Sequence, residues 1–240
     1  MPLDILLTVL VTAMIQSLFG VGVLLFGTPA LLLLGYDFVN ALSVLLPISL
    51  AINALQILKH YRYIDIDFFK NVLLYTIPLV VWFLFIATSN KVNIGLLVGT
   101  FLLFVALKSF VPAVERLLQT LVKYEKAYLA AMGLVHGLTN LGGALLTAIV
   151  HGKGYDKHTT RVTVAICYAT FAVFQLATLL VLGSEFELTY SQHATFLQIG
   201  VIVFLLTEEL VYSGIDNNKY SKFFAAFLLA SGVLLITKSL

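Results

Sequence analysis

Charged residues are scarce in this sequence. Of its 240 residues only 11% are Asp, Glu, Lys or Arg, whereas a typical soluble domain contains about 25%. Apolar residues make up 60% of the chain, and the mean hydropathy is +1.02. Several apolar runs reach the length of about 18 residues that a helix needs to cross a bilayer. The composition therefore excludes a water-soluble globular domain and predicts an all-α membrane protein with several crossings.

Cysteine and catalytic motifs are also lacking. Cys167 is the single cysteine, so no internal disulfide can form. The sequence has no GxSxG or HExxH motif, no acidic or histidine cluster at metal-ligand spacing, and no basic patch that would indicate nucleic acid. We therefore expect no enzymatic activity, no metal or cofactor, and no nucleic-acid partner. The alternative from another class is a membrane-embedded enzyme or the anchoring subunit of an enzyme.

Glycine, by contrast, gathers in two stretches inside apolar segments: residues 20–29 (GVGVLLFGTP) and residues 137–147 (GLTNLGGALLT). The first segment, residues 3–34, would be about 48 Å long as one helix, whereas the bilayer core is about 30 Å thick. Glycine and Pro29 weaken it near its middle, so neither arm comfortably spans. The second segment, residues 127–152, divides in the same way. The first segment also lacks the basic start and cleavage site of a signal peptide, so we expect it to stay in the membrane.

The two broken segments open two similar halves of the chain. Ordinary spans are predicted at residues 39–59, 69–89 and 91–110, and again at 158–182, 192–213 and 219–240. At an offset of 120 residues, or one fewer past a gap, Gly22 matches Gly142, Tyr36-Asp37 matches Tyr155-Asp156, and Gln56 matches Gln175. Internal repeats of this kind are typical of secondary transporters. We predict a first membrane repeat at 1–110, an amphipathic cytoplasmic connector at 111–126 and a second membrane repeat at 127–240.

The basic residues predict the topology. If each broken segment enters the membrane and returns to the same face, all 14 Lys and Arg residues except Lys91 and Lys238 share one face. If each broken segment crosses once, the basic residues divide almost evenly between the two faces. The positive-inside rule favours the first arrangement, which places both termini outside and makes the two repeats inverted. A double crossing within each broken segment has the same parity and stays open.

Two re-entrant breaks would form a site for a small anion. The second arm of each break begins at its tip, so its free N–H groups and positive helix end point into the membrane. No Lys or Arg lies centrally in a predicted span, so backbone amides and neutral polar side chains would have to hold the anion. The candidate substrate-binding residues are Gln16, Gly20, Gly22, Val23, Asn53, Gln56, His136, Thr139, Asn140, Gly142, Gly143 and Gln175, with Tyr168 and Thr170 as further polar candidates.

Simpler interpretations of these residues stay open. Glycine in membrane helices also serves close packing, a role that suits Gly133 and Gly137, and buried amides such as Asn53 also form interhelical hydrogen bonds. Glu208 and Glu209 lie about one turn inside the cytoplasmic end of a predicted span. They are candidates for proton coupling, and an interfacial position is the alternative.

The glycine pattern resembles that of a known family. The motif GxGxxxxGxP at Gly20, Gly22, Gly27 and Pro29, together with GLVHGLTNLGGALL from Gly133, resembles the TauE/SafE family of sulfite exporters. The resemblance extends over nearly the whole chain through its size, its two similar halves and a glycine motif opening each half. It implies a multi-pass transporter of the cytoplasmic (inner) membrane that moves sulfite or a sulfur-containing organic anion such as a sulfonate.

These observations together predict a secondary transporter that exports a small anion by alternating access, with its site at the two glycine-rich tips. Its expected partners are the anionic substrate and the lipid bilayer, with proton coupling as a possibility and a monomer or homodimer as its state. A passive anion channel is the second alternative.

Overall fold

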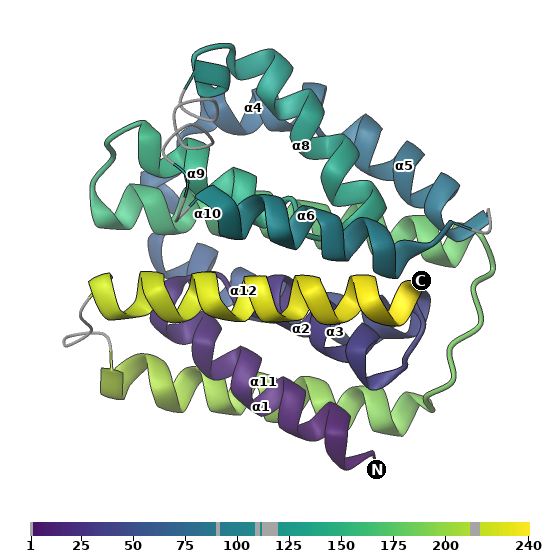
Figure 1. The fold of residues 1–240 in the computed structure, drawn as a ribbon. Helices are drawn as coiled ribbons and strands as arrows, with labels where there is room; N and C mark the ends of the chain where they lie inside the picture. The colour runs from purple at the N-terminus through teal and green to yellow at the C-terminus, as the bar shows by residue number, and fades with distance from the viewer. Residues whose placement is uncertain (1, 90–91, 109–110, 112–119, 212–216) are drawn as a thin grey trace.

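The computed structural model describes residues 2–89, 92–108, 111, 120–211 and 217–240, with side chains except at residues 18–19, 108, 209–211 and 217–225. Within these ranges the chain is helical and its helices are joined by short loops, which confirms the all-α prediction (Figure 1). The helices are α1 (Leu3–Phe19), α2 (Val23–Leu34), α3 (Phe38–His60), η1 (Tyr61–Tyr63), α4 (Ile66–Tyr75), α5 (Ile77–Ser89), α6 (Ile94–Lys108), α8 (Glu125–Thr139), α9 (Gly143–Gly152), α10 (Lys157–Val181), α11 (Tyr190–Val211) and α12 (Asn217–Ser239).

Both predicted helix breaks are present. The first lies between α1 and α2, where Gly20 caps α1 with a φ of 73°. This left-handed conformation is one that glycine adopts without steric cost. The second break lies between α8 and α9, where Asn140 caps α8 with a φ of 61°. Asparagine is among the few other residues that adopt this conformation readily, so one backbone geometry ends both helices.

Each broken helix forms a hairpin that returns to the end of the molecule where it began. The hydroxyl of Tyr36, just after α2, donates to Asp4 in the first turn of α1 at 2.9 Å. In the same way Lys153, which caps the end of α9, donates to Glu125 at the start of α8 at 2.7 Å. We call α1–α2 the first hairpin and α8–α9 the second hairpin. The arms of the first hairpin are about 25 and 18 Å long.

The long helices α3 and α10 pack against each other at the centre of the molecule. Asp37 caps the start of α3 and Asp156 caps the start of α10, which explains why a Tyr-Asp pair recurs in both halves. The two helices run antiparallel, because the rings of His60 at the end of α3 and His158 at the start of α10 are 4.9 Å apart. The first hairpin therefore opens at one end of this helix pair and the second hairpin opens at the other (Figure 1).

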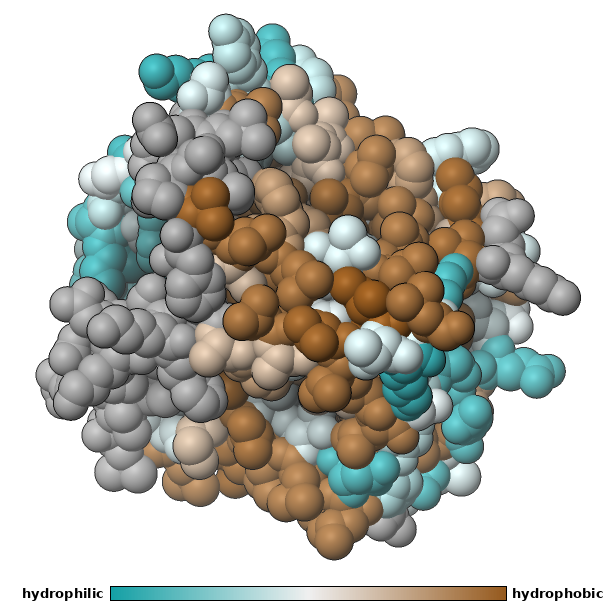
Figure 2. Space-filling view, viewed as in Figure 1, coloured by the Kyte–Doolittle hydropathy of each residue, from teal (hydrophilic) through white to brown (hydrophobic). Residues whose placement is uncertain are grey.

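Four stretches of the described residues are long and apolar enough to cross a membrane: Phe38–Tyr63, Ile66–Ser89, Lys157–Val181 and Tyr190–Glu208. Within the third predicted span of the first half, 91–110, α6 has 15 described residues and is about 22 Å long. In Figure 2 apolar side chains gather over α6 and α12, while hydrophilic residues gather toward the ends of the molecule. Residues 112–119 of the predicted connector lie outside the described residues.

Several glycines bring helices into backbone contact. A Cβ on Gly133 would lie 2.6 Å from the Thr76 carbonyl oxygen, and a Cβ on Gly137 would lie 2.7 Å from the Val80 carbonyl oxygen, so both glycines set α8 directly on the α4–α5 segment. Small residues give membrane helices this close approach. The packing interpretation of this glycine pair therefore has direct geometric support.

Replacing Gly137 with alanine tests this contact. The new Cβ would press against the Val80 carbonyl oxygen and the Phe83 Cβ at 2.8 Å, so we expect a loss of about 1–3 kcal/mol in stability. The measurement is the thermal unfolding midpoint of the purified protein in detergent. Gly152→Ala is the matched control, because its Cβ would meet Val122 at an ordinary 3.8 Å. A Gly137→Ala protein as stable as the control would contradict the assignment.

Candidate functional site

The first break is built around one glutamine. Gln16 Oε1 accepts a hydrogen bond from the backbone N–H of Val23 at 2.9 Å, and Gln16 Nε2 donates to the Gly20 carbonyl at 3.3 Å and to Asn53 Oδ1 at 3.4 Å. A Cβ on Gly22 would lie 2.6 Å from the Gln16 backbone nitrogen, so this glycine packs directly on α1. These five predicted site residues are therefore brought together. The Val23 amide, which we expected to face a ligand, is paired with Gln16.

The second break has a similar arrangement with different residues. His136 Nε2 and Gln175 Oε1 are 3.2 Å apart, and the His136 ring lies 4.5 Å from the Phe171 ring. The Thr139 hydroxyl accepts from the Leu141 backbone N–H at 3.2 Å and thereby caps the break. A Cβ on Gly142 would lie 2.5 Å from the His136 Cβ, just as Gly22 packs on Gln16. In both hairpins the residue six positions before this glycine forms a hydrogen bond with a polar side chain of a long central helix. At the first break this is Gln16 with Asn53 on α3, and at the second it is His136 with Gln175 on α10.

Along the α3–α10 pair, the tips of the two hairpins extend past each other and do not meet end to end. Asn53, which contacts the first tip, lies seven residues before the end of α3, or about 10 Å along the helix. Gln175, which contacts the second tip, lies six residues before the end of α10, or about 9 Å. Since α3 and α10 are antiparallel, each tip passes the middle of the bundle. Asn140 Nδ2 at the second tip donates to Thr28 Oγ1 in the middle of α2 at 2.9 Å.

Several buried polar atoms that lack a hydrogen bond belong to predicted site residues. Among the described residues, both amide atoms of Gln56, the Nδ1 atom of His136, the Oδ1 atom of Asn140 and the Nε2 atom of Gln175 are buried and lack a hydrogen bond. Buried polar atoms are nearly always satisfied in folded proteins, and exceptions indicate a bound water, an ion or a functional site. Gln56 is the clearest case, because its side chain is 2% exposed and makes no hydrogen bond to any described residue.

One face of α10 contacts both hairpins. Arg161, Tyr168 and Gln175 follow at seven-residue spacing, which places them on the same face about 10.5 Å apart along the axis. The Arg161 Cγ lies 3.8 Å from the position of a Cβ on Gly20. A Cβ on Gly143, the first residue of α9, would overlap the Tyr168 hydroxyl. This polar face therefore runs from the first tip to the second. Thr170, in contrast, donates to the Ile166 carbonyl of its own helix.

Arg161 is the residue that sequence reasoning missed. It falls within the predicted span 158–182 but is not among the candidate site residues, and its side chain is only 10% exposed. Arg161 Nη2 lies 2.8 Å from Glu208 Oε1, and Lys59 Nζ lies 3.8 Å from Glu208 Oε2. The signal that could have found Arg161 is its seven-residue spacing to Tyr168. Glu208 thus takes part in an ion-pair cluster, and the side chain of Glu209 lies outside the described residues.

A second polar cluster at the same end of the molecule joins the two halves. The Tyr155 hydroxyl, in the loop before α10, donates to Asp65, which caps α4. Burial would raise the pKa of Asp65, but the hydrogen bonds from the Phe68 amide and Tyr155 together with the charge of Lys153 outweigh it and lower that pKa. Burial and the bond to Asp65 raise the pKa of Tyr155. We call this end of the molecule, where Lys59, Lys153 and Arg161 lie, the basic end. The hydrogen bond between Tyr155 and Asp65 joins the two halves there.

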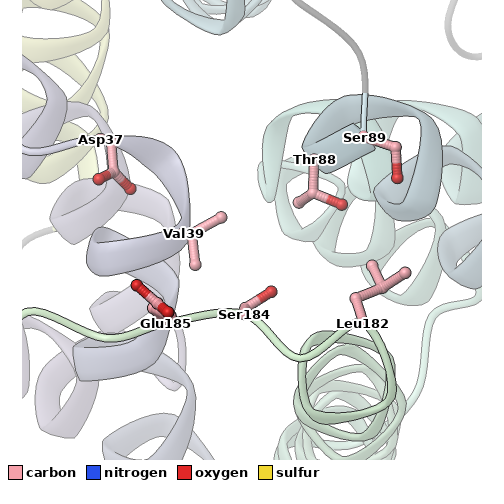
Figure 3. A pocket seen from close by; sticks show the side chains of 7 residues that line it. All are labelled: Asp37, Val39, Thr88, Ser89, Leu182, Ser184 and Glu185. Carbon is pink, nitrogen blue, oxygen red and sulfur yellow. The ribbon is translucent and has the colours of Figure 1, made fainter.

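A pocket of about 290 Å³ opens at the opposite end of the molecule, between the start of α3 and the ends of α5 and α10 (Figure 3). Asp37 and Glu185 lie on one side of it, with Thr88 and Ser89 across from them. None of the predicted site residues lines this pocket. Two carboxylates would repel an anion, so the pocket is not a site for the predicted substrate.

The sequence was compared with known proteins. A family model described as "Sulfite exporter TauE/SafE" matches residues 5–235, which is nearly the whole chain. No curated protein and no solved structure matches it.

Two substitutions test whether Gln16 stabilises the structure through its hydrogen bonds while Gln56 does not. Gln16→Leu leaves the Val23 N–H without its acceptor and Asn53 without its donor, so we expect a loss of about 1–3 kcal/mol in stability. Gln56→Leu breaks no hydrogen bond to a described residue, so we expect unchanged or higher stability. Thermal unfolding in detergent measures both. Equal destabilisation by the two substitutions would show that Gln56 has a structural partner.

Proposed function

The chain belongs to the sulfite exporter TauE/SafE family, and we propose from this premise that it is a secondary transporter for a small anion. The substrate proposed is sulfite or a related sulfur-containing organic acid such as a sulfonate, exported across the cytoplasmic (inner) membrane by alternating access. The anion binds between the two helix breaks. Membership of a transporter family favours this function over that of a membrane-embedded enzyme or its anchoring subunit.

The unpaired polar atoms around the breaks are the observation that carries the proposed site. Gln56 and Gln175 each hold a buried amide nitrogen with no hydrogen bond to a described residue. An oxyanion supplies the acceptors that these nitrogen donors lack. A substrate that is only transiently bound explains why such groups are retained in a membrane interior, where an unsatisfied polar group costs free energy.

An inverted repeat of residues 1–110 and 127–240 is part of the proposal. Two features support it. The hairpins open at opposite ends of the α3–α10 pair, and equivalent helices of the two halves make equivalent contacts with the other half. Thus α1 packs on α11 while α8 packs on α5, and α3 packs on α11 while α10 packs on α5. Inverted repeats of this kind let one half rock against the other around a fixed site.

The proposed orientation places the basic end in the cytoplasm. Lys59, Lys153 and Arg161 lie at that end, whereas Lys238 donates to the carbonyl of Leu33 at the other end, next to the opening of the first hairpin. Both chain termini lie at the end that holds Lys238 (Figure 1). The positive-inside rule then puts both termini outside.

Uptake into proteoliposomes tests the function. With a panel of sulfur oxyanions, sulfonates and carboxylates, we expect saturable flux of sulfite or a sulfonate that a proton gradient can drive uphill. We expect Gln56→Leu and Gln175→Leu to reduce the flux about tenfold or more at low substrate, because each removes a donor that the anion meets near one of the two breaks.

Two results would contradict parts of this proposal, and a third tests Glu208 and Glu209 as candidates for proton coupling. Flux that never saturates and never runs uphill would indicate a passive channel. Wild-type flux in both glutamine variants would move the site elsewhere. An unchanged pH dependence of transport in Glu208→Gln and Glu209→Gln proteins would dismiss both residues as proton carriers.

Reporter fusions test the orientation. A reporter active only outside the cytoplasm should be active when fused after Leu240 and inactive when inserted in the loop at residues 153–156. A cytoplasmic reporter should give the reverse pattern at both positions. A cytoplasmic C-terminus would overturn the proposed topology, while the hairpin geometry would be unaffected.

A further inference from the structure

An ion pair that is largely shielded from solvent lies beside the first helix break, at the basic end of the molecule. Arg161 is the fifth residue of α10 and Glu208 lies near the end of α11, and their side chains are only 10% and 13% exposed. We propose that Arg161 binds the substrate anion at the first break, and that Glu208 is an internal carboxylate that occupies Arg161 while the site is empty. This inference rests on the proposed function and names a residue of the same site.

The position of Arg161 supports a role at the tip. Its Cγ lies 3.8 Å from the Cβ position of Gly20, whose carbonyl also accepts from Gln16. The base of the Arg161 side chain therefore lies beside Gly20, at a distance where a Cβ on that residue would just touch it. An anion beside the start of α2 would meet the positive end of that helix together with the charge of Arg161.

Stability alone does not account for such a pair. Removing two charges from water is costly, and replacement of a buried ion pair by apolar residues is often neutral or stabilising. Arginine also carries five N–H donors in a planar fork that matches the spacing of oxygens in an oxyanion. The carboxylate of Glu208 presents the same kind of oxygen pair as a sulfite or sulfonate, so both can occupy the same donors.

Glu208 has a second cation within reach. Lys59 on α3 lies 3.8 Å from its other oxygen, and Lys59 is largely exposed. His60 follows Lys59 on α3, and its ring lies 4.9 Å from that of His158 on α10. The described groups that face Glu208 therefore include Arg161, Lys59 and His60. A carboxylate displaced from Arg161 by an incoming anion can keep its ion pair with Lys59.

Gln56 supplies a second hydrogen-bond donor for the anion, on the face of α3 that carries Asn53 and His60. It lies between Asn53 and His60 on α3, at the three- and four-residue spacing that places all three on one helix face. Asn53 contacts the first tip through Gln16, and the Gln56 amide is buried without a partner among the described residues. An anion held by Arg161 would thus approach a neutral donor that the empty protein leaves unpaired.

Sulfite binding to the purified protein tests the inference. Calorimetry in detergent would compare the wild type with an Arg161→Gln, Glu208→Gln double variant, which removes both charges and leaves neither one buried alone. We expect the double variant to keep its unfolding midpoint and to lose about ten- to hundredfold in sulfite affinity. We expect Glu208→Gln alone to bind sulfite about tenfold more tightly, because the competing carboxylate is gone.

The control removes an ion pair from the same end of the molecule. Lys70 and Asp67 are 3.4 Å apart and exposed, so Lys70→Gln with Asp67→Asn should leave sulfite affinity unchanged. Wild-type affinity in the Arg161→Gln, Glu208→Gln protein would overturn the role of Arg161. Weaker binding in Glu208→Gln would overturn the competition and make Glu208 a residue that positions Arg161. A wild-type protein that neither binds nor transports any anion of the panel would instead refute the proposed function itself.

Discussion

The structure depends on one constraint: a membrane interior offers no water to satisfy the backbone of an interrupted helix. Two helices are interrupted here, and the surrounding residues compensate for both interruptions. At the first break Gln16 accepts from the Val23 amide, and at the second the Thr139 hydroxyl accepts from the Leu141 amide. Gly22 and Gly142 allow each returning arm to pack directly on the arm before it. One backbone N–H at each break is thus paired by a side chain of the same hairpin, and buried side-chain atoms without a partner lie around both breaks.

Sequence reasoning located the breaks because their chemistry is local. Glycine at position 20 and asparagine at position 140 adopt the backbone conformation that ends a helix, and that preference is visible without any tertiary contact. The matching Tyr-Asp pairs were visible for the same reason, because Asp37 and Asp156 each cap the helix that follows. The family resemblance of the glycine pattern was also confirmed, by a match to residues 5–235.

The parts that could not be predicted depend on how distant segments approach each other. Arg161 was counted only toward the charge of the basic face, because its partner Glu208 lies 47 positions further along the chain. At the first tip the amide of Val23, expected to be free, is paired with Gln16, whose side chain reaches it only because the hairpin folds back. The passage of the two tips past one another follows from the antiparallel packing of α3 and α10, which no local pattern encodes.

The bond between Asn140 and Thr28 has a mechanical consequence. It joins the second tip to the middle of α2, and so connects two hairpins that open toward opposite ends of the molecule. A protein that works by alternating access must never expose its site to both sides at once, since a continuous opening would dissipate the gradient. Because the hairpins share this contact, a displacement of one would act on the other. In a transporter of the proposed kind, this pair of neutral side chains would help to link the inner opening to the outer one.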